Sequence, residues 1–168
     1  PFGLASPAAW LRRAGAEVTL LDLSRQRFDE PAIRHADVVG FSLPMHTATR
    51  LALPVLDRVR TLAPSARLCA FGLYAPPNAG LLRDRGVAAT FGAECEADLV
   101  AFAMERCPPG IDPLVPEPGV GSRARPAVAR LQLIVPDRTG MPALDRYAKL
   151  QEGGRSRITG YTEATRGG

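Results

Sequence analysis

The sequence predicts an α/β protein whose residues 1–106 form a doubly wound parallel sheet covered by helices. Strand-like and helix-like patterns alternate along this stretch, and the links between them are short. Such alternation is typical of parallel sheets with right-handed crossovers. The strand-like runs are also almost wholly apolar, as expected for strands that are buried on both faces.

Each element has a local signal. Ser6 and Pro7 place an N-cap and a first-turn proline before the first helix, and Gly15 ends it. The predicted helices are Ala8–Ala14, Thr47–Leu62, Asn78–Arg85 and Glu96–Arg106, and Pro31–Ala36 is predicted to be a short helix or a turn. The predicted strands are Glu17–Leu23, Val38–Ser42, Ala66–Gly72 and Val87–Phe91. Pro54 lies inside the longest helix pattern, so this helix is predicted either to begin nearer Leu51 or to bend.

The predicted fold needs a strand before its first helix. We therefore expect the first strand of the sheet to precede Pro1, and the sequence, which does not begin with Met, to be cut at both ends. Residues 107–130 are rich in Pro, Gly and Arg and are interpreted as a linker. Residues 131–168 are interpreted as the incomplete start of a second domain. Its predicted elements are a strand over Leu131–Pro136, a short helix over Pro142–Leu150 and, over Arg157–Gly167, a strand that runs into a turn.

Composition argues against several classes of partner. The net charge of +4 comes almost wholly from arginines that are scattered along the chain, so no nucleic-acid partner is expected. The sequence has no secretion signal and no apolar run near 18 residues, so a cytoplasmic protein without a membrane partner is expected. The three cysteines have no metal-site spacing and are expected to be buried or incidental thiols.

The stretch from Asp37 to Ala52 is the first place to look for function. It runs from a buried strand through a loop of small and polar residues into a helix. Ligands of open α/β sheets bind outside the carboxyl ends of the strands, where this loop lies. The loops at this edge offer glycines, hydroxyls and backbone N–H groups, which suit a large hydrogen-bonding ligand. No dinucleotide fingerprint or phosphate-binding Walker loop is present.

Three of these loops resemble segments of the cobalamin-binding domains of the methionine synthase and methylmalonyl-CoA mutase type. Gly40–Met45 looks like the Ser-x-Leu region that follows the third strand of that family. Phe71–Pro76 lies where the family carries a Gly-Gly pair, although here Leu73 replaces the second glycine. Val87–Gly92, followed by an acidic helix start, is similar to the segment that closes the family's pocket for the nucleotide tail.

Two further segments extend the resemblance. Gly3 falls where the last glycine of the family's Asp-x-His-x-x-Gly loop would lie, so the Asp and the cobalt-ligating His would precede Pro1. Gly160–Gly167 resembles the strand that leads into the Cys-x-x-x-Cys-x-x-Cys loop of radical SAM enzymes. The order of these segments is that of cobalamin-dependent radical SAM proteins.

The resemblance implies a Rossmann-like or flavodoxin-like module that binds cobalamin and presents its corrin to the chain's own C-terminal radical SAM barrel. The barrel would hold a 4Fe-4S cluster and S-adenosylmethionine and perform the reaction, often a methyl transfer, so no catalytic residue or metal ligand is expected in this fragment. The implied cofactor-binding residues are Gly3, Ser42, Leu43, His46, Thr47, Gly72, Tyr74 and Gly92.

Other interpretations of these residues stay open. Thr47 or Thr49 could cap the following helix, and His46 could simply begin it. Gly72 and Gly92 could be turn glycines without a ligand nearby. As a whole, the domain could have lost the cofactor and serve in docking or in substrate gating. An independent flavodoxin-like enzyme or nucleotide binder is the weakest alternative, because no phosphate-binding or acid–base constellation is present.

Overall fold

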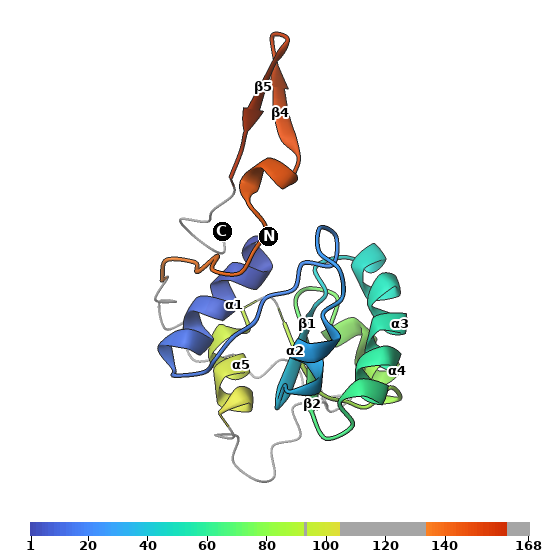
Figure 1. Ribbon diagram of the computed structural model, residues 1–168. Coiled ribbons are helices and arrows are strands. Elements are labelled where there is room, and N and C mark those ends of the chain that lie inside the picture. Colours follow the sequence, from blue (N-terminus) through green and yellow to red (C-terminus); the bar gives the residue numbers. More distant parts are fainter. Residues whose placement is uncertain (93, 105–133, 161–168) are drawn as a thin grey trace, which may run out of the picture.

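The computed structural model of the chain describes residues 1–92, 94–104 and 134–160. Three strands, β1 (Val38–Ser42), β2 (Arg67–Phe71) and β3 (Val87–Phe91), form a parallel sheet in the order β1-β2-β3. Figure 1 shows this sheet with its surrounding helices. The protein is therefore α/β with a parallel sheet, as predicted, and its architecture is compatible with a Rossmann-like fold.

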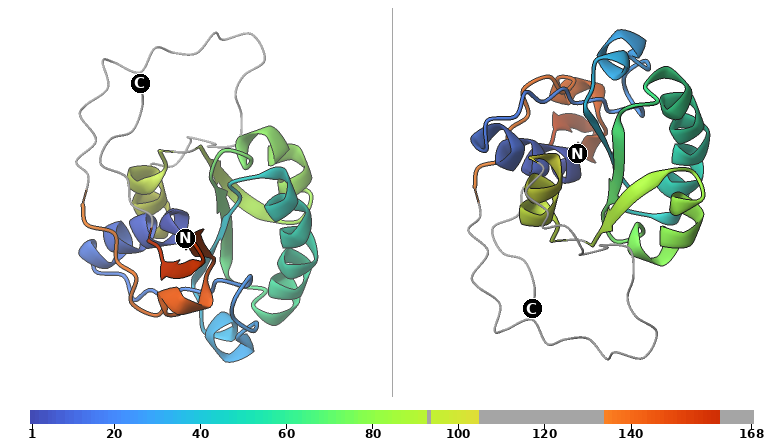
Figure 2. Two further views of the ribbon diagram at one scale, coloured as in Figure 1. Left: turned by 90° about the horizontal axis from the view of Figure 1, so that it is seen from above. Right: turned by 90° about the horizontal axis from the view of Figure 1, so that it is seen from below.

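Helices cover both faces of the sheet. Figure 2 shows α1 (Phe2–Arg13) and α5 (Glu96–Ala103) on one side, and α3 (His46–Leu62) and α4 (Ala79–Arg83) on the other. Side chains alternate between the faces along β2. Leu68 and Ala70 join the core beneath α3 and α4, whereas Cys69 and Phe71 join the core beneath α5.

The helix α3 runs unbroken through Pro54, so the predicted later start at Leu51 is wrong. Its predicted bounds of Thr47–Leu62 are otherwise met within one residue. The 3₁₀ turn η1 (Pro76–Asn78) and α4 replace the single predicted helix Asn78–Arg85. None of the described helices is long and apolar enough to cross a bilayer.

The first helix begins earlier than predicted. Ser6 and Pro7 lie inside α1, which starts at Phe2 and carries no side-chain cap. The prediction failed because burial of Ala5 through Ala9 stabilises the early turns more than a local N-cap would. Gly15 does end the helix: its φ is +95°, and the N–H groups of Gly15 and Ala16 bond back to Arg12 and Leu11.

Glu17–Leu23 does not form the predicted strand. Residues 17–22 have no regular secondary structure and pair with no described strand, although Leu20 is buried and Leu21 packs against the core. β1 is consequently an edge strand of the described sheet. The strand prediction failed because strand formation depends on a pairing neighbour that the local sequence does not specify.

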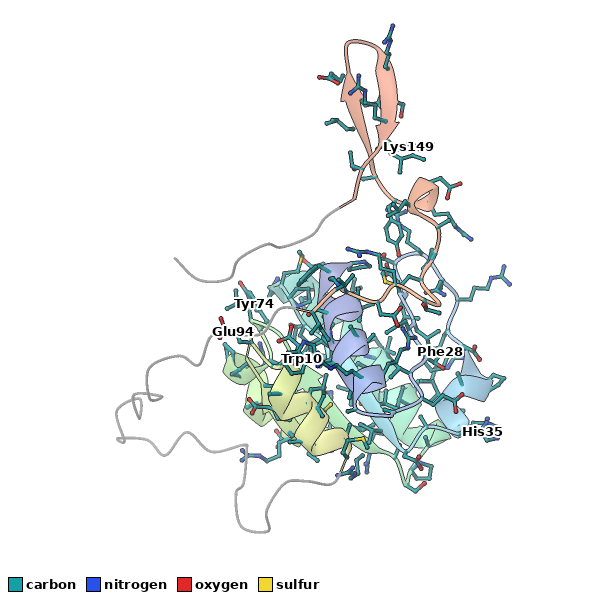
Figure 3. All side chains as sticks on the ribbon, turned by 90° about the vertical axis from the view of Figure 1, so that its left-hand side faces the viewer. Trp10, Phe28, His35, Tyr74, Glu94 and Lys149 are labelled. Atoms are coloured by element: carbon teal, nitrogen blue, oxygen red, sulfur yellow. The ribbon has the colours of Figure 1, made fainter. Side chains whose placement is uncertain are left out.

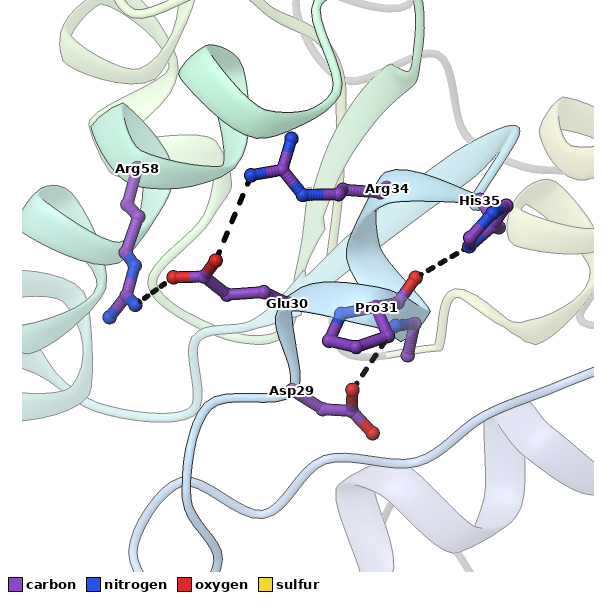
Figure 4. Close-up of polar contacts among 7 residues, drawn as sticks. Asp29, Glu30, Pro31, Arg34, His35 and Arg58 are labelled. Carbon is purple, nitrogen blue, oxygen red and sulfur yellow. Dashed lines mark hydrogen bonds and ion pairs between the residues drawn. The ribbon is translucent and has the colours of Figure 1, made fainter.

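The loop after Asp22 is held against α3 by ionic and cation–π contacts. It leads into the short helix α2 (Glu30–Arg34), where Asp29 caps the N–H of Ala32. Figure 4 shows Glu30 between Arg34 and Arg58, and the Arg58 guanidinium also lies 4.3 Å from the centre of the Phe28 ring. These contacts hold the loop and α2 beside the middle of α3.

The C-terminal part forms a turn and a hairpin. The 3₁₀ turn η2 (Leu144–Arg146) precedes β4 (Lys149–Glu152) and β5 (Arg155–Ile158), which pair antiparallel around Gly153 and Gly154. Ile134–Pro136 is not a strand, and a hairpin strand replaces the end of the helix predicted over Pro142–Leu150. The predicted linker, residues 107–130, and residues 161–168 of the radical SAM-like segment lie outside the described residues.

Candidate functional site

The loops that follow the three strands lie side by side at the carboxyl edge of the sheet. The N–H of Leu43 donates to the carbonyl of Phe71 at 2.7 Å, and the N–H of Tyr74 donates to the carbonyl of Leu43 at 3.0 Å. The N–H of Gly72 bonds to the carbonyls of Phe91 and Gly92 at 3.1 and 3.2 Å. The structure thus brings the predicted loops together, as expected for a parallel sheet.

Gly3 and Ser42 meet where the start of α1 lies against the end of β1. A Cβ atom placed on Gly3 would lie 3.3 Å from Ser42 Oγ. A side chain at position 3 would therefore press on Ser42, whereas glycine fits, and Gly3 itself is exposed while Ser42 is half-buried. Their proximity was not predicted, because it depends on how α1 packs on the sheet.

Leu43 and Gly72 have clear roles in packing. The side chain of Leu43 is only 1% exposed and belongs to the core beneath α3. Gly72 has a φ of +105°, and a Cβ atom there would lie 2.9 Å from the carbonyl oxygen of Leu43. Only glycine fits this conformation and this close approach without strain. The turn therefore explains Gly72 without a ligand.

Met45, His46 and Thr47 are exposed at the start of α3. No side chain caps this helix, so neither Thr47 nor Thr49 takes the capping role considered for them. The hydroxyl of Thr49 instead donates to the carbonyl of Met45 at 3.2 Å. The hydroxyl of Thr47 and the imidazole of His46 thus lie at the surface, where a ligand can reach them.

Apolar side chains are exposed beside these polar groups. Met45 is 56% exposed, Leu73 64% and Tyr74 37%. The bond from Tyr74 to Leu43 keeps the two loops adjacent, and Figure 3 shows Tyr74 and Glu94 at the same end of the domain. Gly92 is also exposed, and a Cβ atom there would have no neighbour within 4 Å. We call Met45, His46, Thr47, Leu73 and Tyr74 the edge surface.

A buried polar pair joins α1 to α5 next to this edge. The hydroxyl of Ser6 donates to Oε1 of Glu96 at 2.7 Å, and both residues are buried. Glu96 is the first residue of α5, where the helix dipole favours a negative charge. Ser6 was predicted to cap a helix, and no local signal connects it with a residue 90 positions away.

Asp22 lies at the centre of a second polar cluster. It is buried and accepts hydrogen bonds from Ser24 Oγ at 2.7 Å and from the hydroxyl of Tyr147 at 2.8 Å. Burial acts to raise the pKa of Asp22, but these hydrogen bonds outweigh it and hold the pKa below its ordinary value. Burial and the bond to Asp22 raise the pKa of Tyr147 to about 12.

Residues 134–147, which we call the strap, bind along α1. The N–H of Asp137 donates to the carbonyl of Ala5 at 3.0 Å, and its carboxylate lies 2.8 Å from the guanidinium of Arg12. Arg12 also donates to the carbonyls of Val18 and Thr139 at 2.7 and 3.1 Å. In both Figures 1 and 2, η2 and the hairpin lie at the end of the domain where α1 begins.

Two hollows lie away from the edge surface. One is lined by Ala36, Asp37, Ser65, Arg67, Ala103 and Met104, and the other by Leu23, Gln26, Phe28, Pro54, Val55 and Arg58. Neither contains a predicted site residue. In residues 1–92, 94–104 and 134–160, no three His, Cys, Asp or Glu side chains are placed to hold a metal ion. Cys69 and Cys95 are buried, as expected, and burial raises the pKa of Cys69 to about 12.

Comparisons with known proteins add no family assignment. A scan against protein-family models and searches of the curated proteins and of the solved structures found no match to the chain.

Proposed function

We propose that this α/β domain binds cobalamin at the edge surface and presents the corrin to a radical SAM barrel formed by the chain's continuation. The observation that carries the proposal is the exposure of apolar, hydroxyl and imidazole side chains on adjoining loops at the carboxyl edge. The resemblance of three loops to cobalamin-binding domains supplies the identity of the ligand. The 4Fe-4S cluster and S-adenosylmethionine would belong to the barrel.

The edge surface has the chemistry that a corrin needs. A corrin ring is broad and apolar on its faces and carries amide groups at its rim. Met45, Leu73 and Tyr74 offer apolar contact, while Thr47 and His46 can hydrogen-bond the amides. The open space at Gly92 would allow close approach of the ligand to the backbone. When bound, cobalamin supplies methyl-transfer chemistry, and the residues of this domain hold and orient it.

The nucleotide tail of the cofactor would bind beside the edge surface. Ser42 and Thr47 are expected to hydrogen-bond either the tail or the side chains of the corrin, and Ser42 lies beside Gly3 of α1. Gly3 is exposed and Ser42 is half-buried, so both lie where a tail can reach them from the surface.

The proposal includes a finer view of the fold, a doubly wound sheet with one more strand beside β1. Two observations support it: β1 is an edge strand of the described sheet, and the segment before Asp22 pairs with no described strand although Leu20 is buried. A parallel strand placed next to β1 would pair with an edge that is otherwise open.

A second candidate is a docking or substrate-gating domain without cofactor. The strap favours it, because this segment of the C-terminal part already binds α1 and Asp22 at the same end of the domain. In that case the edge surface would contact protein rather than corrin.

Binding of hydroxocobalamin separates the two candidates. The full chain is incubated with hydroxocobalamin and desalted, and the retained corrin is measured by its visible absorbance. We expect retention by the native chain and a loss of about tenfold in affinity for Met45→Ala/Tyr74→Ala, since two apolar contacts are worth roughly 1–3 kcal/mol. Leu81→Ala, a change of an exposed leucine on α4, is the matched control and should bind normally.

No retention by the native chain would reject cobalamin binding and favour the docking candidate. Equal retention by the double variant and the native chain would place any cobalamin elsewhere than on the edge surface.

A further inference from the structure

The hollow between α3 and the loop after Asp22 has the make-up of a protein-binding surface. It has a volume of about 420 Å³ and is lined by Leu23, Gln26, Phe28, Pro54, Val55 and Arg58; we call it the α3 hollow. Leu23 is 43% exposed, and Leu51, one turn before Pro54 on α3, is 67% exposed. The apolar surface therefore extends from the hollow along the helix. Exposed apolar side chains that are gathered in this way mark interaction sites, whereas single ones need no explanation.

Arginines border this apolar surface. Arg50, Pro54 and Arg58 follow one another at intervals of four residues, so the two arginines lie on the face of α3 that carries Pro54. Arg27 lies on the loop that forms the opposite wall, and both Arg27 and Arg50 are exposed. In the described part of the chain, neither Arg27 nor Arg50 forms an ion pair. Their charges are therefore available to a partner.

Glu30 and Phe28 hold the guanidinium of Arg58 at the rim of the α3 hollow. Figure 4 shows Arg58 reaching from α3 to the carboxylate of Glu30, and the guanidinium lies 4.3 Å from the centre of the Phe28 ring. Arginine has five N–H donors, and the only hydrogen bond of Arg58 within the described residues runs from Nη2 to Glu30. The other donors of Arg58 are thus positioned in advance for a second carboxylate, which reduces the entropy lost on binding.

We propose that the α3 hollow binds a partner protein through an acidic amphipathic helix. The large apolar side chains of that helix enter the hollow and cover Leu51, while its carboxylates pair with Arg27, Arg50 and Arg58. Charge decides the class of partner, because arginines on both walls attract an acidic segment and repel a basic one. An open groove along a helix is also the kind of surface into which an amphipathic helix lays its apolar face. The α3 hollow shares no residue with the edge surface, so this binding does not depend on cobalamin.

A designed peptide serves as the probe. It is a fluorescein-labelled helical peptide with leucine and tryptophan on one face and glutamate on the others, and its counterpart carries lysine in place of glutamate. Fluorescence anisotropy with the full chain measures the affinity of both peptides. We expect the acidic peptide to bind about tenfold or more tightly than the basic one, and its affinity to fall as salt is added.

Variants of the chain locate the binding. Leu23→Glu/Leu51→Glu replaces the exposed apolar side chains by negative charge and should weaken the acidic peptide about tenfold. Leu81→Glu makes the same change on α4 and should leave the affinity at its native value. Arg50→Glu should weaken the acidic peptide several-fold, whereas Arg13→Glu, an exposed position on α1, should not.

Three results would overturn the proposal: no binding of the acidic peptide to the native chain, equal affinity for the two peptides, or an equal loss of affinity in Leu81→Glu and in the double variant. Retention of hydroxocobalamin by Leu23→Glu/Leu51→Glu is measured alongside and should equal that of the native chain. A failure of the α3 hollow is therefore distinguishable from a failure of the edge surface.

Discussion

The hydroxyl of Tyr147 donates a 2.8 Å hydrogen bond to Oδ2 of Asp22, although the two residues are 125 positions apart in the chain. This bond joins the strap, residues 134–147, to the end of the segment that follows α1. It also ties the C-terminal part to the α/β domain, so the two parts are not independent of each other.

Replacing Tyr147 by Phe should lower the free energy of unfolding by about 1–2 kcal/mol, because the Asp22 carboxylate loses a hydrogen bond in a partly buried position. Urea denaturation of the full chain measures the change. Tyr74→Phe is the control, since Tyr74 is partly exposed and its hydrogen bonds in the described structure come from its backbone. An equal loss of unfolding free energy in both variants would show that the hydrogen bond from Tyr147 to Asp22 does not stabilise the protein.

Gly72→Ala should destabilise the protein by about 1–3 kcal/mol, because the residue has a φ of +105° and its Cβ would press on the Leu43 carbonyl. Gly92→Ala should leave stability within about 0.5 kcal/mol of the native value, since its Cβ would enter open space. Thermal unfolding compares the two. If Gly92→Ala weakens hydroxocobalamin binding while remaining fully stable, the open space at Gly92 is part of the site.

Leu43→Ala should cost about 2–5 kcal/mol of stability because it leaves a cavity in the core beneath α3. Leu51 lies on α3 but is 67% exposed, so Leu51→Ala should change stability little. Denaturant titration of both variants gives the difference. A small loss for Leu43→Ala would contradict its place in the core.

The strap should stay bound across a wide range of pH. Hydrogen bonds from Thr139 and the nearby Arg12 lower the pKa of Asp137 to about 2, so its stabilising effect is present above its ordinary pKa and is lost only as pH falls through that value. The raised pKa of Tyr147, about 12, has the opposite sign: its contribution is complete below the ordinary pKa of 10 and is lost as pH rises through 12.

Amide hydrogen exchange in α1 should therefore not depend on the ionisation of Asp137 or Tyr147 between about pH 4 and pH 10, once the intrinsic pH dependence of exchange is removed. Measurement at three pH values within this range tests it. A step in the corrected α1 rate near neutral pH would require another titrating group in the strap contacts.

Local sequence patterns predicted most of the sheet and its helices. The strands Val38–Ser42 and Val87–Phe91 were predicted with the bounds that the structure shows, because runs of apolar residues bounded by polar or glycine residues carry a strong signal. Gly15 was also predicted correctly, because a glycine that can adopt a positive φ is a strong local signal for the end of a helix. The start of α1 was predicted wrongly, because Ser6 is a typical N-cap residue but its hydroxyl donates to Glu96 instead.

The candidate site was predictable only in part. The adjacency of the loops follows from parallel topology, so residues such as Thr47 and Tyr74 could be grouped in advance. The strap could not, because nothing near Asp137 or Tyr147 in the sequence identifies Arg12 or Asp22 as a partner. Packing of α1 likewise decided that Gly3 faces Ser42.

The edge position of β1 has a practical consequence for work in solution. Val38, Val39 and Phe41 lie on a strand whose outer side has no partner in the described sheet, and such edges pair readily with other chains. We therefore expect this chain to self-associate as its concentration rises. Binding and exchange measurements belong at low micromolar concentration, and light scattering should establish the monomeric range before any of them is interpreted.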